Sequence, residues 1–207
     1  MIDYNVLPAE EEILATVEAI RVRGFTVKLV ETRADALNLL KQLIPAGAEV
    51  MTGASKSLQE IGLEDLLISG AHPWVNLKDA VLAEQDPVKQ MQLRRQSTLA
   101  EYYLGSVHAI AETGEMVFVS GTGSQLPAYA YGSPNVIWVA GVQKIVPTLE
   151  LAIQRVREYC LAQEDARMKS LGYPGSMISK LLIMEHESQV YNQRTATLIL
   201  VKESLGV

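Results

Sequence analysis

The sequence predicts an α/β fold, with an open, mainly parallel sheet, flanking helices and one β-hairpin. Helical periodicities alternate with short apolar runs, as expected where helices join parallel strands. The runs at 49–52 and 135–140 have the length and apolar character of buried strands. A further strand, a tight turn at 112–114 and a second strand over 116–119 predict the hairpin, because Gly114 can take the positive φ that such a turn requires.

The composition of the chain argues against several classes of function. The 207 residues suit one domain, and 48% hydrophobic with 20% charged residues is an ordinary balance for a chain with a real core. The formal net charge of −6 argues against nucleic acid or an anionic membrane surface as a general partner. The one cysteine, Cys160, excludes a disulfide or a cysteine-held iron–sulfur cluster within one chain. Because acidic residues 10–12 lie where a signal peptide would be basic and apolar, we expect a cytoplasmic protein.

The first half of the chain predicts helices and strands in alternation. Carboxylates at 10–12 favour a helix start, and Thr32 with Asp35 resembles a capping pair for the next helix. The expected elements are a helix over 10–24, a strand over 25–30, a helix over 32–45, a strand over 49–52, a helix over 61–68 and a short strand over 74–77.

The second half contains the hairpin and the strongest strand. We expect a helix from Asp86–Pro87 towards Tyr102–Tyr103, a short helix at Pro127, a strand over 135–140, a helix from Thr148 through Cys160, an irregular stretch over 163–192 and a strand over 195–201. Four segments are predicted to be buried strands of one sheet: Val50–Met51, Ala109–Ile110, Val117–Val119 and Val136–Val139. The domain organisation is a single α/β domain over 1–207, with an N-terminal region 1–47, a core 48–160 and a C-terminal segment 161–207.

The loop between the strand at 49–52 and the next helix is a candidate anion site. Gly53, Ser55, Lys56 and Ser57 supply hydroxyls, a lysine and backbone N–H groups that can hold a phosphate or a carboxylate. The loop is not a P-loop, because the second glycine before the lysine is missing. The alternative is a capped helix, with Ser55 as N-cap and Lys56 in solvent.

A second loop follows the hairpin. Gly121 and Gly123 leave its backbone uncovered, and Thr122, Ser124 and Gln125 add polar side chains, so its N–H groups can also face an anion. Open α/β sheets bind ligands at the carboxyl ends of their strands. We therefore expect the two loops to open on the same side of the molecule.

His108 and Glu112 are the candidate catalytic pair. Positions four apart on one strand share a face, so both side chains could reach one pocket and move a proton. The competing interpretation is a buried His108 satisfied by backbone and a solvated Glu112 at the turn. Lys144 either faces the negative charge of a ligand or lies in water.

The sequence gives little support for a metal site, a reactive cysteine or a serine hydrolase. His72, His108 and His186 are in no recognised ligand spacing, so no metal site is expected, and no cofactor is predicted. Cys160 is on the apolar face of a helix and is expected to be a packed thiol. No Gly-x-Ser-x-Gly motif is present, which argues against a serine hydrolase of that type.

Three runs carry a family resemblance. Ser-Val-His-Ala-Ile-Ala-Glu-Thr-Gly at 106–114, Thr-Gly-Ser-Gln-Leu-Pro-Ala-Tyr-Ala at 122–130 and Val-Ile-Trp-Val-Ala-Gly-Val-Gln-Lys-Ile-Val-Pro at 136–147 resemble the lactate-utilisation (LUD) domain family. The resemblance implies a Rossmann-like fold of the sugar-phosphate isomerase and CoA-transferase type. It also implies a cytosolic component of lactate or small organic acid oxidation that binds a small anion or a redox partner, with iron–sulfur oxidoreductase subunits as candidate partners.

Two departures limit that resemblance. Some longer members have a cysteine cluster before the final strand, and residues 170–194 contain none. Related phosphosugar isomerases place an aspartate where this chain reads Gly105-Ser106-Val107-His108, so proton transfer by that aspartate is not expected. The alternative function is a stand-alone enzyme that acts on a phosphorylated or CoA-linked small molecule through the two loops. A small anionic metabolite is the expected ligand in either case, and homo-oligomer formation is left open.

Overall fold

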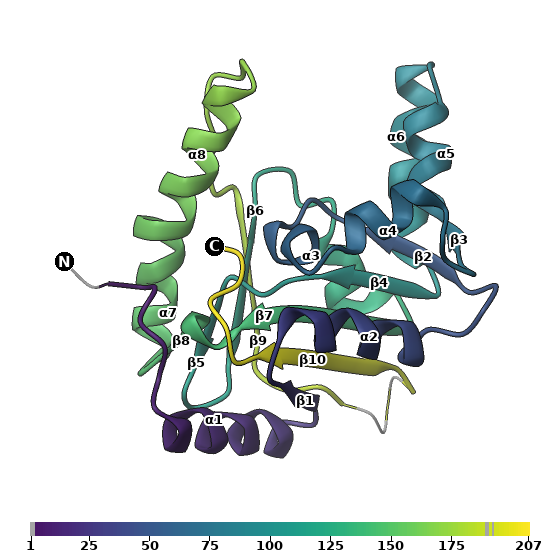
Figure 1. Cartoon of the computed structure of the whole chain (residues 1–207). Coiled ribbons are helices and arrows are strands. Elements are labelled where there is room, and N and C mark those ends of the chain that lie inside the picture. Colours follow the sequence, from purple (N-terminus) through teal and green to yellow (C-terminus); the bar gives the residue numbers. More distant parts are fainter. Residues whose placement is uncertain (1–2, 189–190, 192) are drawn as a thin grey trace.

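The structure is a computed structural model that describes residues 3–188, 191 and 193–207. Its larger sheet has six strands, all parallel, which confirms the predicted α/β class (Figure 1). In spatial order these strands are β1 (Thr26–Val30), β10 (Thr195–Val201), β7 (Asn135–Gly141), β4 (Tyr102–Gly105), β2 (Glu49–Thr52) and β3 (Val75–Asn76).

A smaller sheet contains the predicted hairpin. Its strands are, in order, β8 (Ile145–Val146), β5 (Ala109–Ala111), β6 (Met116–Ser120) and β9 (Lys180–Met184). Gly114 closes the turn between β5 and β6 with a φ of 97°, and its N–H donates to the Ala111 carbonyl at 2.8 Å. Glycine takes that backbone conformation without the steric cost that a Cβ would add.

The prediction that four segments share one sheet was wrong. Val50–Met51 and Val136–Val139 lie in the larger sheet, whereas Ala109–Ile110 and Val117–Val119 lie in the smaller one. The reason is β4, which pairs with both β2 and β7 and therefore fills the position between them. The hairpin that follows β4 pairs instead with β8 and β9.

Helices cover both faces of the larger sheet. They are α1 (Glu10–Val22), α2 (Arg33–Leu43), α3 (Lys56–Glu60), α4 (Leu63–Ser69), α5 (Leu77–Ala83), α6 (Pro87–Gln96), α7 (Leu149–Arg155) and α8 (Leu161–Ser170), with single turns η1 (Ser97–Leu99), η2 (Ala128–Gly132), η3 (Val142–Lys144) and η4 (Val156–Cys160). The predicted capping pair is present, since Thr32 Oγ1 accepts from Asp35 N at 3.2 Å and Asp35 Oδ2 accepts from Thr32 N at 3.0 Å.

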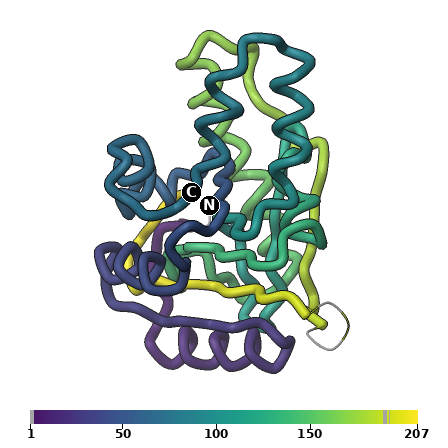
Figure 2. Tube along the Cα trace, turned by 90° about the vertical axis from the view of Figure 1, so that its right-hand side faces the viewer, coloured from purple at the N-terminus to yellow at the C-terminus, as the bar shows by residue number. Residues whose placement is uncertain are grey.

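The alternation of side chains along β10 divides the core into two layers. Leu198 and Leu200 pack with α1 and with the smaller sheet, whereas Ile199 and Val201 pack with α2, α3 and α4. Figure 2 shows α2 and the α3–α4 pair on one side of the sheet. Because β10 is buried on both faces, it reads in the sequence as a continuous apolar run.

Two segments differ from their predictions. The helix at Asp86 ends at Gln96, and Tyr102 opens β4 instead of closing that helix. In the stretch predicted to be irregular, α8 runs to Ser170 and the apolar residues 181–184 belong to β9. The helix limits were missed because α6 buries none of its residues, so its apolar pattern gives no sign of where it stops. Positions 189–190 and 192 of that stretch lie outside the described residues.

The α5–α6 pair and α8 project from the same end of the molecule (Figure 1). Neither α5 nor α8 is long, at 7 and 10 residues. Along the part of the chain that the structure describes, no helix has both the length and the apolar character needed to cross a membrane.

A substitution at Leu104 tests the packing at the centre of the core. Its side chain is fully buried on β4, between Thr52 of β2 and Ile137 of β7. We expect Leu104→Ala to lower the free energy of unfolding by about 2–5 kcal/mol, because the lost methyl groups leave a cavity among fixed strands. The matched control Ile68→Ala changes a leucine-sized side chain that is 84% exposed and should alter stability by less than about 0.5 kcal/mol. Equal denaturant midpoints for the two variants would contradict the placement of β4.

Candidate functional site

Four neighbouring strands bring polar groups to one place. Ser57 follows β2, Ser106 follows β4, Lys144 follows β7 and Leu205 follows β10. Because these strands are adjacent and parallel, their carboxyl ends meet at the same edge, where open α/β sheets bind ligands. We call Ser57, Ser106 and Lys144 the Ser–Ser–Lys cluster.

Lys144 is the centre of this cluster. Its side chain is 2% exposed, and its ammonium donates to Ser57 Oγ at 3.1 Å, Ser106 Oγ at 3.0 Å and the Val107 carbonyl at 3.0 Å. These three acceptors match the three N–H groups of a lysine. The hydroxyls of Ser57 and Ser106 lie 3.0 Å from each other. Of the two situations predicted for Lys144, the one in water was wrong.

The segment after β10 covers Ser57. The Leu205 carbonyl accepts from Gln143 Nε2 at 2.8 Å and lies 3.5 Å from Ser57 Oγ. Gly206 follows with a φ of 75°, and a Cβ at that position would lie 2.1 Å from Ser57 Oγ and 3.0 Å from Lys144 Nζ. Only glycine can therefore pass over the cluster at this distance.

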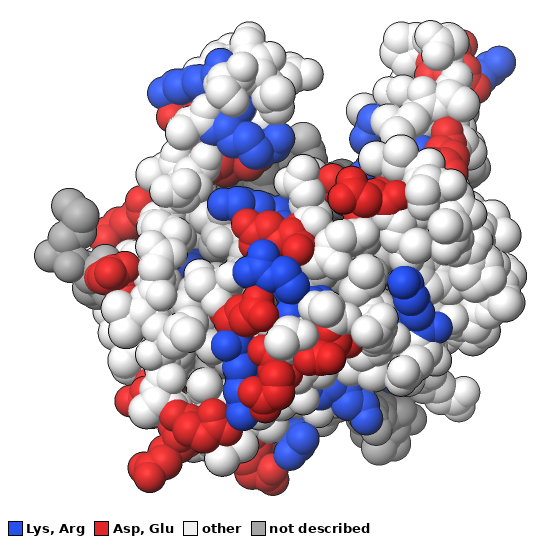
Figure 3. All heavy atoms as spheres, in the orientation of Figure 1, with Lys and Arg blue, Asp and Glu red and all other residues white. Residues whose placement is uncertain are grey.

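Ion pairs also join the segment after β10 to residues near the N-terminal helices. Lys202 Nζ lies 2.7 Å from Glu10 Oε1 and 3.0 Å from Glu31 Oε1, and Glu203 Oε2 lies 2.7 Å from Arg33 Nε. Figure 3 shows acidic and basic side chains alternating in a band on the face of the molecule that is turned to the viewer in Figure 1. The pairs are largely exposed, so they orient the segment more than they stabilise the fold.

The cluster carries a positive charge without a paired acid. Burial, and after it the charge of Arg155, lower the pKa of Lys144 from 10.5 to about 7. Glu60 raises that pKa, but its own oxygens contact Gly206 N at 2.6 Å and Lys56 Nζ at 3.7 Å. Among the described residues, no carboxylate lies within ion-pair distance of Lys144. The interior is therefore suited to a negative ligand.

Arg155 is a second buried cation near Lys144. Its guanidinium donates through Nη1 to the His108 carbonyl at 2.5 Å and to Cys160 Sγ at 3.0 Å, and it lies over the rings of Tyr4 and Tyr159 at 5.7 and 5.0 Å. Its Nε and Nη2 have no hydrogen-bond partner within the described residues. Burial lowers the pKa of Arg155, and the positive charge of Arg155 in turn lowers the pKa of Lys144.

His108 faces these two cations as a neutral ring. Burial, then Lys144 and Arg155, lower the pKa of His108 to about 3. Its Nδ1 accepts from Val119 N at 3.3 Å, which assigns the proton to Nε2. At neutral pH the imidazole can therefore donate a hydrogen bond through Nε2, while Nδ1 is already engaged. Glu112 sits at the hairpin turn, where its backbone N–H donates to the Val146 carbonyl at 2.9 Å.

The loop at 53–57 is divided between a cap and the cluster. Ser55 Oγ accepts from Leu58 N at 3.3 Å as the N-cap of α3, and the Lys56 side chain is 54% exposed. Ser57, the next residue, points inward to Lys144. The anion-binding roles of Gly53, Ser55 and Lys56 stay predictions.

The loop at 121–125 lies beside the first loop. A Cβ on Gly53 would be 3.8 Å from Gln125 Cβ, so the two loops meet, as expected. Ser120 Oγ accepts from Gly123 N at 2.8 Å and lies 3.0 Å from Gln125 Oε1, so part of the loop is already satisfied from within. Gly121, Thr122 and Ser124 are exposed. Ligand binding by this loop stays a prediction.

Sequence reasoning missed four residues of this edge: Ser106, Arg155, Leu205 and Gly206. The sequence could have indicated Ser106, because it directly follows Gly105 at the end of a strand. The predicted helix instead reached Tyr102–Tyr103, so this strand end was not recognised. Arg155 looks like an ordinary charged helix residue. The last two are recognisable only once the path of the chain after β10 is known.

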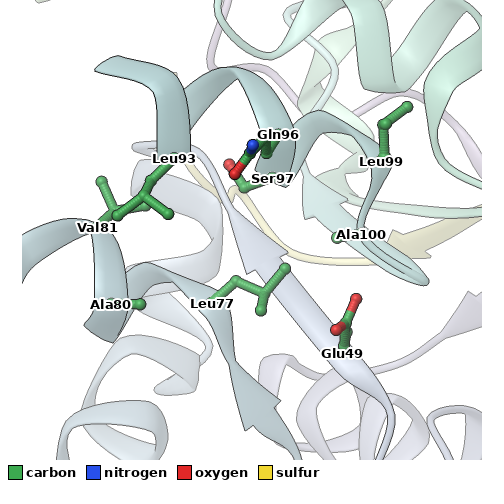
Figure 4. Close-up of a pocket in the computed structure, with 9 residues that line it drawn as sticks. All are labelled: Glu49, Leu77, Ala80, Val81, Leu93, Gln96, Ser97, Leu99 and Ala100. Atoms are coloured by element: carbon green, nitrogen blue, oxygen red, sulfur yellow. The ribbon is translucent and has the colours of Figure 1, made fainter. Parts of the chain in front are cut away.

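A cavity of about 240 Å³ lies elsewhere. It is lined by residues of α5, α6 and η1, by Ala100 and by Glu49 at the start of β2, and most of the side chains labelled in Figure 4 are apolar. Glu49 and Ala100 lie at or before the amino ends of their strands, away from the cluster. None of the candidate site residues lines it.

Comparisons with known proteins agree with this architecture. A family model described as LUD domain matches residues 13–180. A crystal structure of a DUF162 family protein from Deinococcus radiodurans is similar, with a TM-score of 0.56 and 14% identity, over 94% of this chain and 99% of that one. At that identity the likeness shows a shared fold. No curated protein matches the chain.

The lowered pKa of Lys144 predicts how stability depends on pH. Between about pH 7 and 10.5 the unfolded chain binds a proton that the folded chain has released, so the free energy of unfolding should rise by about 1.4 kcal/mol per pH unit from this group. Urea titrations of the wild type and of Lys144→Met at several pH values measure it. Subtracting the free energy of unfolding of the variant from that of the wild type at each pH removes the opposing contributions of Tyr103 and Cys160. Burial raises the pKa values of these two groups. Parallel curves for both proteins would contradict the prediction.

Proposed function

The chain belongs to the LUD domain family, and from that premise we propose that it is a cytosolic component of the oxidation of lactate or another small organic acid. In this proposal, the carboxylate of the acid binds at the Ser–Ser–Lys cluster. A single buried, free cysteine fits a reducing compartment.

One observation carries the proposal: a buried ammonium with no ion-paired carboxylate among the described residues. A buried charge without a counter-charge is costly, and an anionic ligand would supply the missing charge. Arg155 strengthens the same preference because its charge adds to that of Lys144. In an acidic protein, local cations of this kind are needed to hold an anion against the overall charge of −6.

The cluster offers donors that fit a small carboxylate. Lys144 Nζ and the two serine hydroxyls lie within 3.1 Å of one another, and the three N–H groups of the ammonium are engaged by these hydroxyls and the Val107 carbonyl. A carboxylate that binds here would therefore replace a serine hydroxyl as an acceptor for Lys144 and would accept from the hydroxyl that it displaces. Ser106 is part-exposed, and it is the side on which a ligand would enter. The ligand is small, since Gly206 and Leu205 cover the other side.

Oxidation of the acid requires an electron acceptor. The resemblance to the LUD family makes iron–sulfur oxidoreductase subunits the candidate acceptors, and one cysteine cannot hold such a cluster in this chain. Within this proposal the chain holds and orients the acid, and the redox partner takes the electrons.

Titration calorimetry with L-lactate and pyruvate tests the carboxylate site. Lys144→Met keeps the length of the side chain and removes its charge, so we expect the affinity for L-lactate to fall by roughly one to two decades, the loss typical of one charged hydrogen-bond partner. Lactamide, which lacks the negative charge, should bind the wild type more weakly than L-lactate does.

Lys41→Ala is the matched control, because it removes an exposed lysine on α2, far in the fold from the cluster. Its affinity for L-lactate should equal that of the wild type. Lys56→Ala separately tests the loop prediction. If Lys144→Met binds L-lactate as tightly as the wild type while far-UV circular dichroism shows an intact fold, the cluster is not the carboxylate site.

A further inference from the structure

The two serines and the lysine of the cluster form a closed triangle of polar atoms. Ser106 Oγ lies 3.0 Å from Lys144 Nζ and 3.0 Å from Ser57 Oγ, and Ser57 Oγ lies 3.1 Å from Lys144 Nζ. In acyl-transfer chemistry, a serine becomes nucleophilic when an adjacent base accepts its proton, and a neutral lysine can be that base. Carboxylate binding alone does not require the second hydroxyl to bridge the first to the amine.

We propose that Ser106, Ser57 and Lys144 form an acyl-transfer centre that hydrolyses small acyl esters or thioesters through an acyl-Ser106 intermediate. This activity goes beyond the carboxylate binding proposed above and uses the other protonation state of the same lysine.

Burial decides which serine is the nucleophile. Ser57 is 1% exposed and lies under Gly206, so no acyl group can approach it. Ser106 is part-exposed and keeps its hydroxyl within reach of both partners. Ser57 is therefore the bridge, and Ser106 is the group that attacks.

The step balances as follows. Ser106 Oγ forms a bond to the acyl carbon and gives its proton to Lys144 Nζ, directly or through the hydroxyl of Ser57. The bond from the acyl carbon to the alkoxide or thiolate leaving group breaks, and that group takes the proton from Lys144. A water molecule then repeats the sequence, which releases the carboxylic acid and restores Ser106.

The surroundings of Lys144 favour the neutral amine that this step needs. Burial comes first and the charge of Arg155 second in lowering the pKa of Lys144; Cys160 and then Glu60 oppose them, and Lys56 adds the smallest lowering effect. His108 is neutral at this pH and adds no charge. With a pKa of about 7, Lys144 is neutral in a large fraction of molecules at pH 8.

Hydrolysis of p-nitrophenyl acetate, with intact-protein mass spectrometry, tests the proposal. The wild type should become acetylated once, at Ser106, and release nitrophenolate with a rate that rises from pH 6 to 8. Ser106→Ala should abolish the acetylation, and Lys144→Met should lower the rate by roughly 10²- to 10⁴-fold, the usual contribution of a general base.

Ser97→Ala is the matched control. Ser97 is also a buried serine, but its hydroxyl donates to the Arg94 carbonyl at 2.9 Å, at the end of α6, and its loss should leave the rate unchanged. Ser106→Cys provides a second variant, in which the thiol should be acylated in place of the hydroxyl. Circular dichroism confirms that each variant is folded.

Opposite pH profiles separate the two proposals. Acyl transfer should rise above pH 7, whereas L-lactate affinity should fall as Lys144 loses its proton. Acetylation at another residue, or equal rates in the wild type and in folded Ser106→Ala, would overturn the acyl-transfer centre even if L-lactate binds. Acetylation of Ser106 without L-lactate binding would support this centre and remove only the carboxylate site.

Discussion

The ammonium of Lys144 is the interaction on which this edge of the molecule depends. It reaches hydroxyls that follow β2 and β4 and a carbonyl beside β5, so one side chain ties the ends of neighbouring strands together. Burying an unpaired charge is unfavourable, and hydrogen bonds to neutral acceptors offset only part of the cost. The lowered pKa of Lys144 expresses that imbalance. A fold that needed only a brace could use an apolar residue here, so a charged lysine in this position points to chemistry.

Close backbone approach makes this arrangement possible. A Cβ on Gly141 would lie 2.3 Å from the Glu203 carbonyl and 2.6 Å from Leu205 N, and Gly206 sits equally close to Ser57. These two glycines let the segment after β10 cross the ends of β7 and β2 without a gap. As a result, Lys144 is shielded from water and is only 2% exposed. The same shielding lowers the pKa of the lysine.

Much of the fold can be predicted from the sequence, and the parts that cannot have physical reasons. The strand at 49–52 agrees with β2, and the strand at 195–201 agrees with β10, because both are short apolar runs between clear helix signals. β4 was missed because Tyr102 and Tyr103 follow a helix without a buried face. Without β4, the position between β2 and β7 is unfilled in the predicted sheet, so the hairpin strands were placed in the larger sheet. Lys144 was named as a candidate, but its burial depends on Ser57, Ser106 and Gly206, which are distant in sequence and come together only in the folded chain.

The smaller sheet completes the charged interior. It places the His108 carbonyl against Arg155 of α7 and the ring of His108 against Val119 of β6. Arg155 also contacts Cys160 of η4, so the hairpin and the long helical segment after Thr148 are joined through one guanidinium. Two cations from different elements, Lys144 and Arg155, thus share a region with the neutral His108, whose pKa both of them lower. Their mutual repulsion is unfavourable, and a bound anion or a deprotonated lysine would relieve it. These are the two states in which the carboxylate site and the acyl-transfer centre, respectively, would operate.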